Sequence, residues 1–287
     1  MFVVTDSECT GYGKPGHPEN PERISRTIRH LQKQIEIDVF WEHPLGVADP
    51  ILELAHTREH LRELDRGDRD FDGDTPFYPG IGDYARRSVG AAMKALELAG
   101  QGNNSFSLMR PPGHHATASQ AMGFCYLNQA AICTLHARAC GVPRVAVFDF
   151  DVHHGNGTEA ILKNKEGAAF FSIHQHPCYP GTGAKSQGNC RNYPVAPGTS
   201  AKQYREIAVE ALEDLTKFEP ELLIVSAGFD AYAKDPLAQL QLTETDFHWI
   251  GLQLRQFGIP VVSILEGGYS PDLPELILSY LRGIDGL

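Results

Sequence analysis

The chain has 287 residues, of which 42% are hydrophobic and 21% are charged, a balance typical of a globular, enzyme-sized protein. Acidic residues number 36 against 25 lysines plus arginines, which gives a formal net charge of −11 without any compensating basic block. Direct binding to nucleic acid is therefore disfavoured. No segment approaches the roughly 18 apolar residues of a membrane helix, and the first residues lack the basic region of a signal peptide. We expect no association with a membrane and a cytoplasmic location.

The chain reads as one domain of residues 1–287, because no internal repeat, low-complexity tract or Pro/Ser-rich linker divides it. The cysteines form no Cys-x-x-Cys pair, so reduced thiols are favoured over disulfides or a structural zinc site. They are Cys9, Cys125, Cys133, Cys140, Cys178 and Cys190.

Short apolar runs alternate with amphipathic stretches along the chain, and they predict strands and helices respectively. In chain order we expect a strand at 2–5, helices at 21–35 and 82–100, a strand at 105–109, a helix at 127–141, strands at 144–151 and 168–174, a helix at 200–218, a strand at 221–230, a helix at 243–258 and a strand at 260–269. Near-continuous apolar strands separated by helices are typical of a parallel sheet covered on both faces. The sequence therefore predicts an α/β fold.

Polar, Gly/Pro-rich segments follow five of these strands and read "MRPPGHH", "FDVHHGNG", "SIHQHPCYPGTG", "SAGFD" and "LEGGY". In an open parallel sheet the ligand site lies outside the carboxyl ends of the strands. We therefore expect the residues that carry the chemistry to converge at one edge of the sheet.

Three potential metal ligands lie at the end of the strand expected at 144–151. In an extended segment Asp149, Asp151 and His153 share one face, because side chains alternate along a strand. A lone Asp-x-Asp pair is more often a strand end capped by hydrogen bonds. Asp230, at the end of another apolar strand, shifts the balance towards a metal site, because two carboxylates and one imidazole leave a position open, as in hydrolytic zinc sites.

The segments "RPPGHH" and "EGGY" add groups suited to hydrolysis. His114 and His115 lie side by side after a rigid turn, where one can accept a proton from water while the other holds charge. Tyr269 can donate a hydrogen bond to a developing oxyanion. The alternatives are a histidine pair hydrogen-bonded to the backbone and an ordinary half-buried tyrosine.

Taken together, "HPENPER", "RPPGHHA", "GFCYLN", "VFDFDVHHGNGT", "YPGTG", "SAGFDA", "DPL" and "EGGY" resemble the zinc-dependent histone deacetylase family in order and approximate separation. The resemblance spans nearly the whole chain and is closest to the bacterial, class II-like amidohydrolases. It implies a three-layer, arginase/deacetylase-like α/β fold with a mostly parallel sheet of about eight strands.

The resemblance also implies the catalytic groups. One Zn²⁺ per chain would be bound by Asp151, His153 and Asp230, and would polarise the amide oxygen and its bound water. His115 would be the general base and then the general acid. Tyr269 would polarise the scissile carbonyl.

Further roles follow from the same resemblance. His114 would be an electrostatic partner oriented by Asp149. Asn156 stands where class I members have an aspartate, and since an amide cannot stabilise an imidazolium as a carboxylate does, His115 is expected to stay neutral near pH 7. A potassium ion, usual in the family, would be bound by Asp149 and Ser172.

The implied substrate pocket consists of Gly123, Phe124, Tyr179, Leu237, Asp74 and Gly268. Tyr179 stands where many members have phenylalanine, which makes the pocket more polar. Leu237 stands where acetylpolyamine-specific relatives can have an acidic residue, which favours a peptide or neutral substrate. Asp74 would bind the substrate backbone, although an aspartate that forms a turn is an equal alternative.

The function predicted on these grounds is hydrolysis of the amide bond of acyl-lysine in a peptide or protein. An acetylpolyamine or another small acylated amine is the nearer alternative substrate. Two other classes remain open: a ureohydrolase with two Mn²⁺ ions, and a non-catalytic module that binds acyl-lysine.

Overall fold

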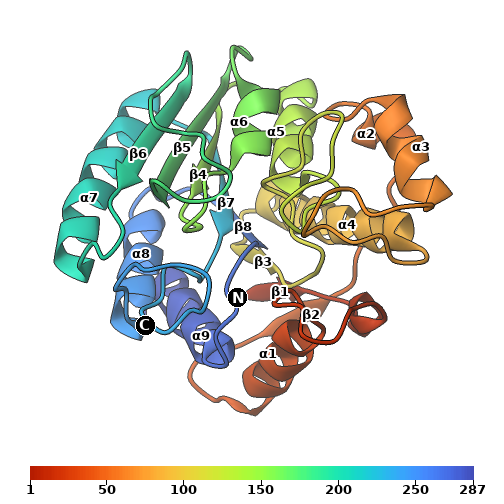
Figure 1. The fold of residues 1–287 in the computed structure, drawn as a ribbon. Helices are drawn as coiled ribbons and strands as arrows, with labels where there is room; N and C mark the ends of the chain where they lie inside the picture. Colours follow the sequence, from red (N-terminus) through yellow and green to blue (C-terminus); the bar gives the residue numbers. More distant parts are fainter.

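Eight parallel strands form a single sheet at the centre of the computed structural model, which describes residues 1–287 (Figure 1). Their order across the sheet is β2-β1-β3-β8-β7-β4-β5-β6, and every neighbouring pair is parallel. The strands are β1 Phe2–Val4, β2 Phe40–Glu42, β3 Ser105–Ser107, β4 Val145–Asp149, β5 Ala168–Gln175, β6 Cys190–Val195, β7 Leu222–Ala227 and β8 Val261–Leu265.

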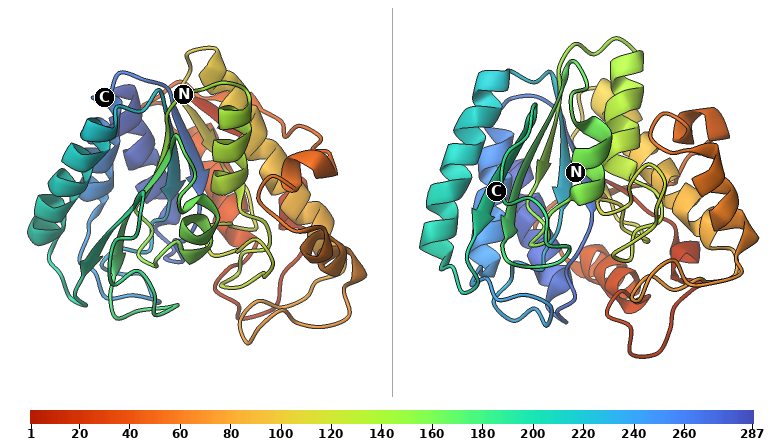
Figure 2. Two further views of the ribbon diagram at one scale, coloured as in Figure 1. Left: turned by 90° about the horizontal axis from the view of Figure 1, so that it is seen from above. Right: turned by 45° about the horizontal axis from the view of Figure 1, so that its top comes forward.

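Helices cover both faces of the sheet, which confirms the predicted three-layer α/β fold. One layer contains α4, α5 and α6, and the other contains α1, α7, α8 and α9, as the two further views show (Figure 2). The helices are α1 Glu22–Lys33, α2 Asp49–Leu52, α3 Arg58–Arg66, α4 Ile81–Gly100, α5 Gln129–Ala139, α6 Asn156–Leu162, α7 Ala201–Phe218, α8 Glu244–Arg255 and α9 Leu273–Asp285, with a 3-10 turn η1 at Ser7–Thr10. None of these helices combines the length and the apolar character needed to cross a bilayer.

The core lies on both sides of the central strands. Every residue of β4, β5, β7 and β8 is buried, as expected for strands covered by helices on both faces. Directly after β4, Phe150 packs against Phe229 and Phe247, with ring centroids 5.7 and 6.3 Å apart. Tyr280 of α9 closes this aromatic cluster at 5.4 Å from Phe150. The cluster anchors the loops after β4 and β7, which carry the candidate metal ligands.

The sequence prediction missed several elements, among them β2, β6 and α9. β2 is a three-residue edge strand whose Phe40 and Trp41 are exposed, and β6 is an edge strand that contains Pro194. Edge strands tolerate proline and need no buried face on both sides. α9 packs against α8 and α1, and most of its residues are buried, which gives it a largely apolar sequence.

Candidate active site

The loops that follow β3, β4, β7 and β8 meet at one edge of the sheet. These four strands are neighbours in the order β3-β8-β7-β4, so their carboxyl ends lie next to each other. In chain order the loops carry the pair His114 and His115, the pair Asp151 and His153, Asp230, and Tyr269. Residues more than 100 positions apart in the chain therefore reach one site.

Asp151, His153 and Asp230 form a buried group whose ligand atoms all lie within 4.8 Å of one another. The His153 Nδ1 is 3.2 Å from Asp151 Oδ1 and 3.1 Å from Asp230 Oδ2. Two glycines make room for the carboxylates: a Cβ on Gly228 would lie 2.1 Å from Asp151 Oδ2, and one on Gly267 would lie 2.1 Å from Asp230 Oδ2. This explains the small residues in "SAGFD" and "EGGY".

The route to this arrangement differs from the predicted one. β4 ends at Asp149, so the expectation of a strand face shared by Asp149, Asp151 and His153 is wrong. Asp149 Oδ1 accepts a hydrogen bond from the backbone N–H of Asp151, and Asp151 Oδ1 accepts one from that of His153. Such side-chain bonds to the backbone two residues ahead compete with a strand and produce turns.

The charges of this group suit a divalent cation. Asp151 and Asp230 are fully buried, and burial together with the charge of Asp151 raises the pKa of Asp230. The N–H groups of Gly267 and Val152 each donate to one carboxylate, at 2.7 and 2.9 Å. The two buried negative charges face the His153 imidazole, and Asp151 Oδ1 also lies 3.8 Å from His114 Nε2. A bound metal ion would balance them, since buried carboxylates are paired or coordinate metals. One nitrogen and two oxygen donors can therefore hold a metal here.

His114 and His115 lie beside the metal-ligand group with their ring centroids 4.0 Å apart, and each has a different partner. His114 Nδ1 lies 3.1 Å from Asp149 Oδ2, whereas His115 Nδ1 lies 2.7 Å from Asn156 Oδ1. Because the amide oxygen only accepts, His115 Nδ1 carries the proton and its Nε2 is left as the acceptor. The His115 ring is 6.0 Å from that of His153.

The two histidines have opposite pKa shifts. Burial alone would lower the pKa of His114, but the carboxylates of Asp151, Asp149 and Glu266 outweigh it and raise the value to about 10. Burial, assisted by the charge of His114, keeps the pKa of His115 well below its ordinary value. The pair therefore combines one cationic and one neutral imidazole, which suits a division into electrostatic partner and general base.

Tyr269, in the loop after β8, is half-buried, and its ring lies 5.9 Å from that of Phe124. Burial raises its pKa well above 10, so the phenol keeps its proton and remains a donor. The backbone is held on both sides, since Asp235 Oδ2 accepts from the Tyr269 N–H at 2.7 Å and the Gly268 carbonyl accepts from Arg23 Nε at 2.8 Å.

Arg23 and Asp235 are supporting residues that the sequence prediction gave no role. Both belong to motifs already noted, "HPENPER" and "DPL". The Arg23 guanidinium lies 5.0 Å from the centre of the Tyr269 ring and also contacts the buried Glu19, which pairs bidentately with Arg110. Their positions in motifs were the only signal available, because contacts across 34 residues for Asp235 and 245 for Arg23 leave no local pattern.

The predicted pocket residues surround the histidine pair and Tyr269. The Tyr179 ring stands perpendicular to that of His115 at 5.0 Å, and a Cβ on Gly123 would lie 2.5 Å from His115 Cδ2. Gly123 and Phe124 both have positive φ, 56° and 68°, so a tight left-handed turn presents the Phe124 ring. Asp74 lies at the exposed rim, and the neighbouring Thr75 hydroxyl accepts the Phe124 N–H at 3.0 Å.

The other predicted residues contact or adjoin the residues that support the site. Leu237 is half-buried, and its N–H donates to Asp235, the residue that holds Tyr269. Gly268 precedes Tyr269 with a φ of 115°, in the region that favours glycine. Ser172 lies opposite Asp149 in the β4–β5 register, and its hydroxyl lies 2.9 Å from His174 Nδ1.

The Tyr179 hydroxyl is buried without a hydrogen-bond partner, which makes a stability prediction possible. Tyr179→Phe is expected to raise the free energy of unfolding by about 1 kcal/mol, because an unpaired buried hydroxyl is costly. Thermal denaturation measures the change. Tyr193→Phe is the matched control, since the Tyr193 hydroxyl donates to Asp214 at 2.8 Å and its loss should destabilise the protein. A lower melting temperature for Tyr179→Phe would contradict the prediction.

Comparison with known proteins agrees with this geometry. Residues 17–283 match the histone deacetylase domain. A probable deacetylase of Methanothermobacter thermautotrophicus is 39% identical, covering 100% of this chain and 91% of the relative. The histone deacetylase-like amidohydrolase of Pseudomonas aeruginosa is 38% identical over 89% of this chain and 73% of its own. The solved acetylpolyamine aminohydrolase of Burkholderia pseudomallei superposes with a TM-score of 0.93 at 27% identity, covering 100% of this chain and 99% of that one.

The fold and the cluster of strand-end residues define a hydrolase of the deacetylase/amidohydrolase class. The chain belongs to the histone deacetylase domain family, since the family match covers nearly its whole length. The predicted resemblance and the arginase/deacetylase-like fold are therefore confirmed.

Proposed function

We propose that this protein, as a single catalytic domain of residues 1–287, is a zinc-dependent amidohydrolase that removes acyl groups from lysine side chains. One observation carries the proposal: a buried three-ligand group lies beside a histidine whose Nδ1 is bonded to an amide and whose Nε2 is free to accept a proton. Hydrolysis of an amide by activated water needs these two components side by side.

The ligand set would be Asp151, His153 and Asp230. A zinc ion there would supply Lewis acidity and lower the pKa of water. His115 Nε2 accepts the proton of the attacking water. The Tyr269 hydroxyl donates to the oxyanion that develops on the substrate. His115 then returns the proton to the leaving lysine amine, and a free carboxylic acid is released.

His114, the pocket and a monovalent cation complete the proposal. His114 remains charged beside Asp149 and stabilises the negative charge that builds up on the oxygen of the reacting carbonyl. The walls formed by Phe124 and Tyr179 enclose the aliphatic stem of the acylated side chain. A potassium ion near Asp149 and Ser172 would bind carboxylate and hydroxyl oxygens, and we propose a cytoplasmic location for the enzyme.

A second substrate class, acetylpolyamines or other small acylated amines, is favoured by one feature. The acidic Asp72 and Asp74 lie near Tyr179, where their charges and, above all, burial raise the pKa of its phenol. Negative charge at the rim attracts a cationic substrate, and an acetylpolyamine keeps at least one ammonium group, whereas the side chain of acyl-lysine is neutral. The apolar side chain of Leu237 favours acyl-lysine, because it adds no carboxylate to pair with a second ammonium group.

A substrate panel tests the proposal. The zinc-loaded protein is expected to release acid from acetyl- and longer acyl-lysine peptides with a higher kcat/KM than from acetylputrescine or acetylspermidine. The reverse order would favour the polyamine function. Binding of these compounds without any turnover would identify a non-catalytic module, and about two bound metal ions per chain would favour a binuclear ureohydrolase.

A further inference from the structure

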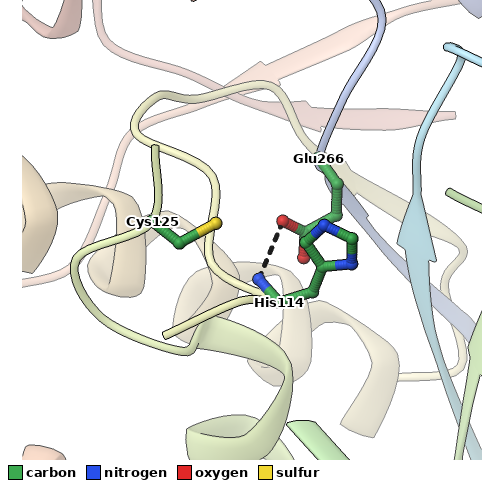
Figure 3. A group of neighbouring side chains, drawn as sticks. All are labelled: His114, Cys125 and Glu266. Carbon is green, nitrogen blue, oxygen red and sulfur yellow. Dashed lines mark hydrogen bonds between the residues drawn. The ribbon is translucent and has the colours of Figure 1, made fainter. Parts of the chain in front are cut away.

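We propose that Glu266 is a positioning residue that holds the catalytic histidine segment in place through its main chain. The inference rests on the proposed function, in which His115 is the base. Glu266 directly follows β8, and its side chain is fully buried. Its Oε2 accepts hydrogen bonds from the backbone N–H groups of Gly113 at 2.7 Å and His114 at 3.1 Å, and Figure 3 shows the second of these.

The carboxylate is itself firmly anchored. Its Oε1 accepts from the hydroxyl of Ser226 in β7 at 3.1 Å. The Glu266 N–H donates to the carbonyl of Ala227 at 3.0 Å, and the Glu266 carbonyl accepts from Arg23. Glu266 therefore links two central strands to the loop after β3, and it can transmit their rigidity to that loop.

The carbonyl side of the histidine segment is held independently. The His114 carbonyl accepts from the N–H groups of Gly157 and Thr158 in α6, at 3.0 and 3.1 Å. Gly113 packs directly against Gln129, the first residue of α5. A Cβ at position 113 would lie only 1.5 Å from Gln129 Oε1. Glu266 accepts hydrogen bonds from the N–H groups of Gly113 and His114 on the opposite side. The backbone of the histidine segment is therefore held between this carboxylate and α6. The directions of both imidazoles depend on this backbone.

The same residues argue against a second metal site. The side chains of His114, Cys125 and Glu266 lie close enough together to raise that possibility (Figure 3). Both Glu266 oxygens already accept hydrogen bonds, however, and His114 Nδ1 faces Asp149. The Cys125 thiol lies 3.3 Å from the Gly123 carbonyl. Glu266 accepts a hydrogen bond from the main chain of His114. This contact positions the backbone and does not coordinate a metal.

Two substitutions at one position test the proposal. Glu266→Met fills the space without an acceptor, whereas Glu266→Gln offers its carbonyl oxygen to the two N–H donors and its amide to Ser226. Glu266→Met is expected to lower kcat at least tenfold with KM changed less than threefold, because small displacements of a catalytic group are costly. Glu266→Gln is expected to restore kcat to within about threefold of the wild type.

Hydrogen exchange gives a readout that does not depend on activity. The amides of Gly113 and His114 should exchange faster in Glu266→Met, and at the wild-type rate in Glu266→Gln, because only the first variant leaves these N–H groups unpaired. Asp246→Asn is the matched control: it alters a buried carboxylate in α8 that pairs with Arg205 and Thr243, and should leave kcat unchanged.

Three results would overturn the proposal: kcat of Glu266→Met within threefold of the wild type, unchanged exchange at Gly113 and His114, or a loss in Glu266→Gln equal to that in Glu266→Met. The last would show that the negative charge acts, and not the hydrogen bonds. If the wild type turns over no substrate, the proposed function fails, whereas the exchange measurements still decide whether Glu266 holds the segment.

Discussion

His115→Ala is expected to lower kcat by about 10²- to 10⁴-fold, the usual contribution of a positioned general base. No other side chain can replace it. His114 is held against Asp149 with its pKa raised to about 10, so it lacks a free lone pair at neutral pH. His153 belongs to the metal-ligand group. Steady-state kinetics on the best substrate of the panel would measure the loss.

The control for this variant is His43→Ala, which removes an exposed histidine that directly follows the edge strand β2 and should keep wild-type kcat. Because burial and the charge of His114 depress the pKa of His115, the unprotonated base is present above that low value and is lost only as the pH falls through it. The acid limb of kcat/KM is therefore expected below pH 6.5, the ordinary histidine value. If His115→Ala kept more than a tenth of wild-type kcat, another group would have to be the base.

Asp230→Asn is expected to abolish the stabilisation that zinc gives to the wild type. Zinc bound to the native state should raise the free energy of unfolding by about 4 kcal/mol at a free concentration of 1,000 times Kd. For a protein of this size that corresponds to a rise in Tm on the order of 10 °C. The variant removes one carboxylate charge, but its amide oxygen still accepts the N–H of Val152, so the loop is expected to remain folded.

Thermal denaturation with and without zinc, together with metal analysis, measures this effect. The wild type should bind about one ion per chain, and chelation should remove both the ion and the activity. Asp246→Asn provides the comparison, because its buried carboxylate lies in α8 and it should keep the full zinc-dependent shift. A rise in Tm for Asp230→Asn equal to that of the wild type would show that zinc binds elsewhere.

Much of the fold followed from local pattern. The apolar runs of β4, β5, β7 and β8 were predictable because a strand buried on both faces must be apolar throughout. The edge strands β2 and β6 were not, since exposure on one side removes that requirement. The end of β4 was placed two residues too late, because the turn formed by Asp149 depends on a side-chain hydrogen bond that no periodicity reveals.

The amino-acid sequence by itself determined the kind of chemistry. Carboxylates, imidazoles and a tyrosine follow apolar strands, and parallel strands must place their carboxyl ends at one edge. The family resemblance then named the same residues that the structure brings together, including Asn156 beside His115.

Only the tertiary structure decided how these groups are held. Arg23 beneath Tyr269, Asp235 at its backbone and Glu266 behind the histidine pair all act across distant parts of the chain. The contact between Glu266 and Gly113 spans 153 positions. The strength of such bonds depends on donor–acceptor distances, which the packing of the sheet and the helices sets. The local sequence around each partner therefore does not reveal these contacts.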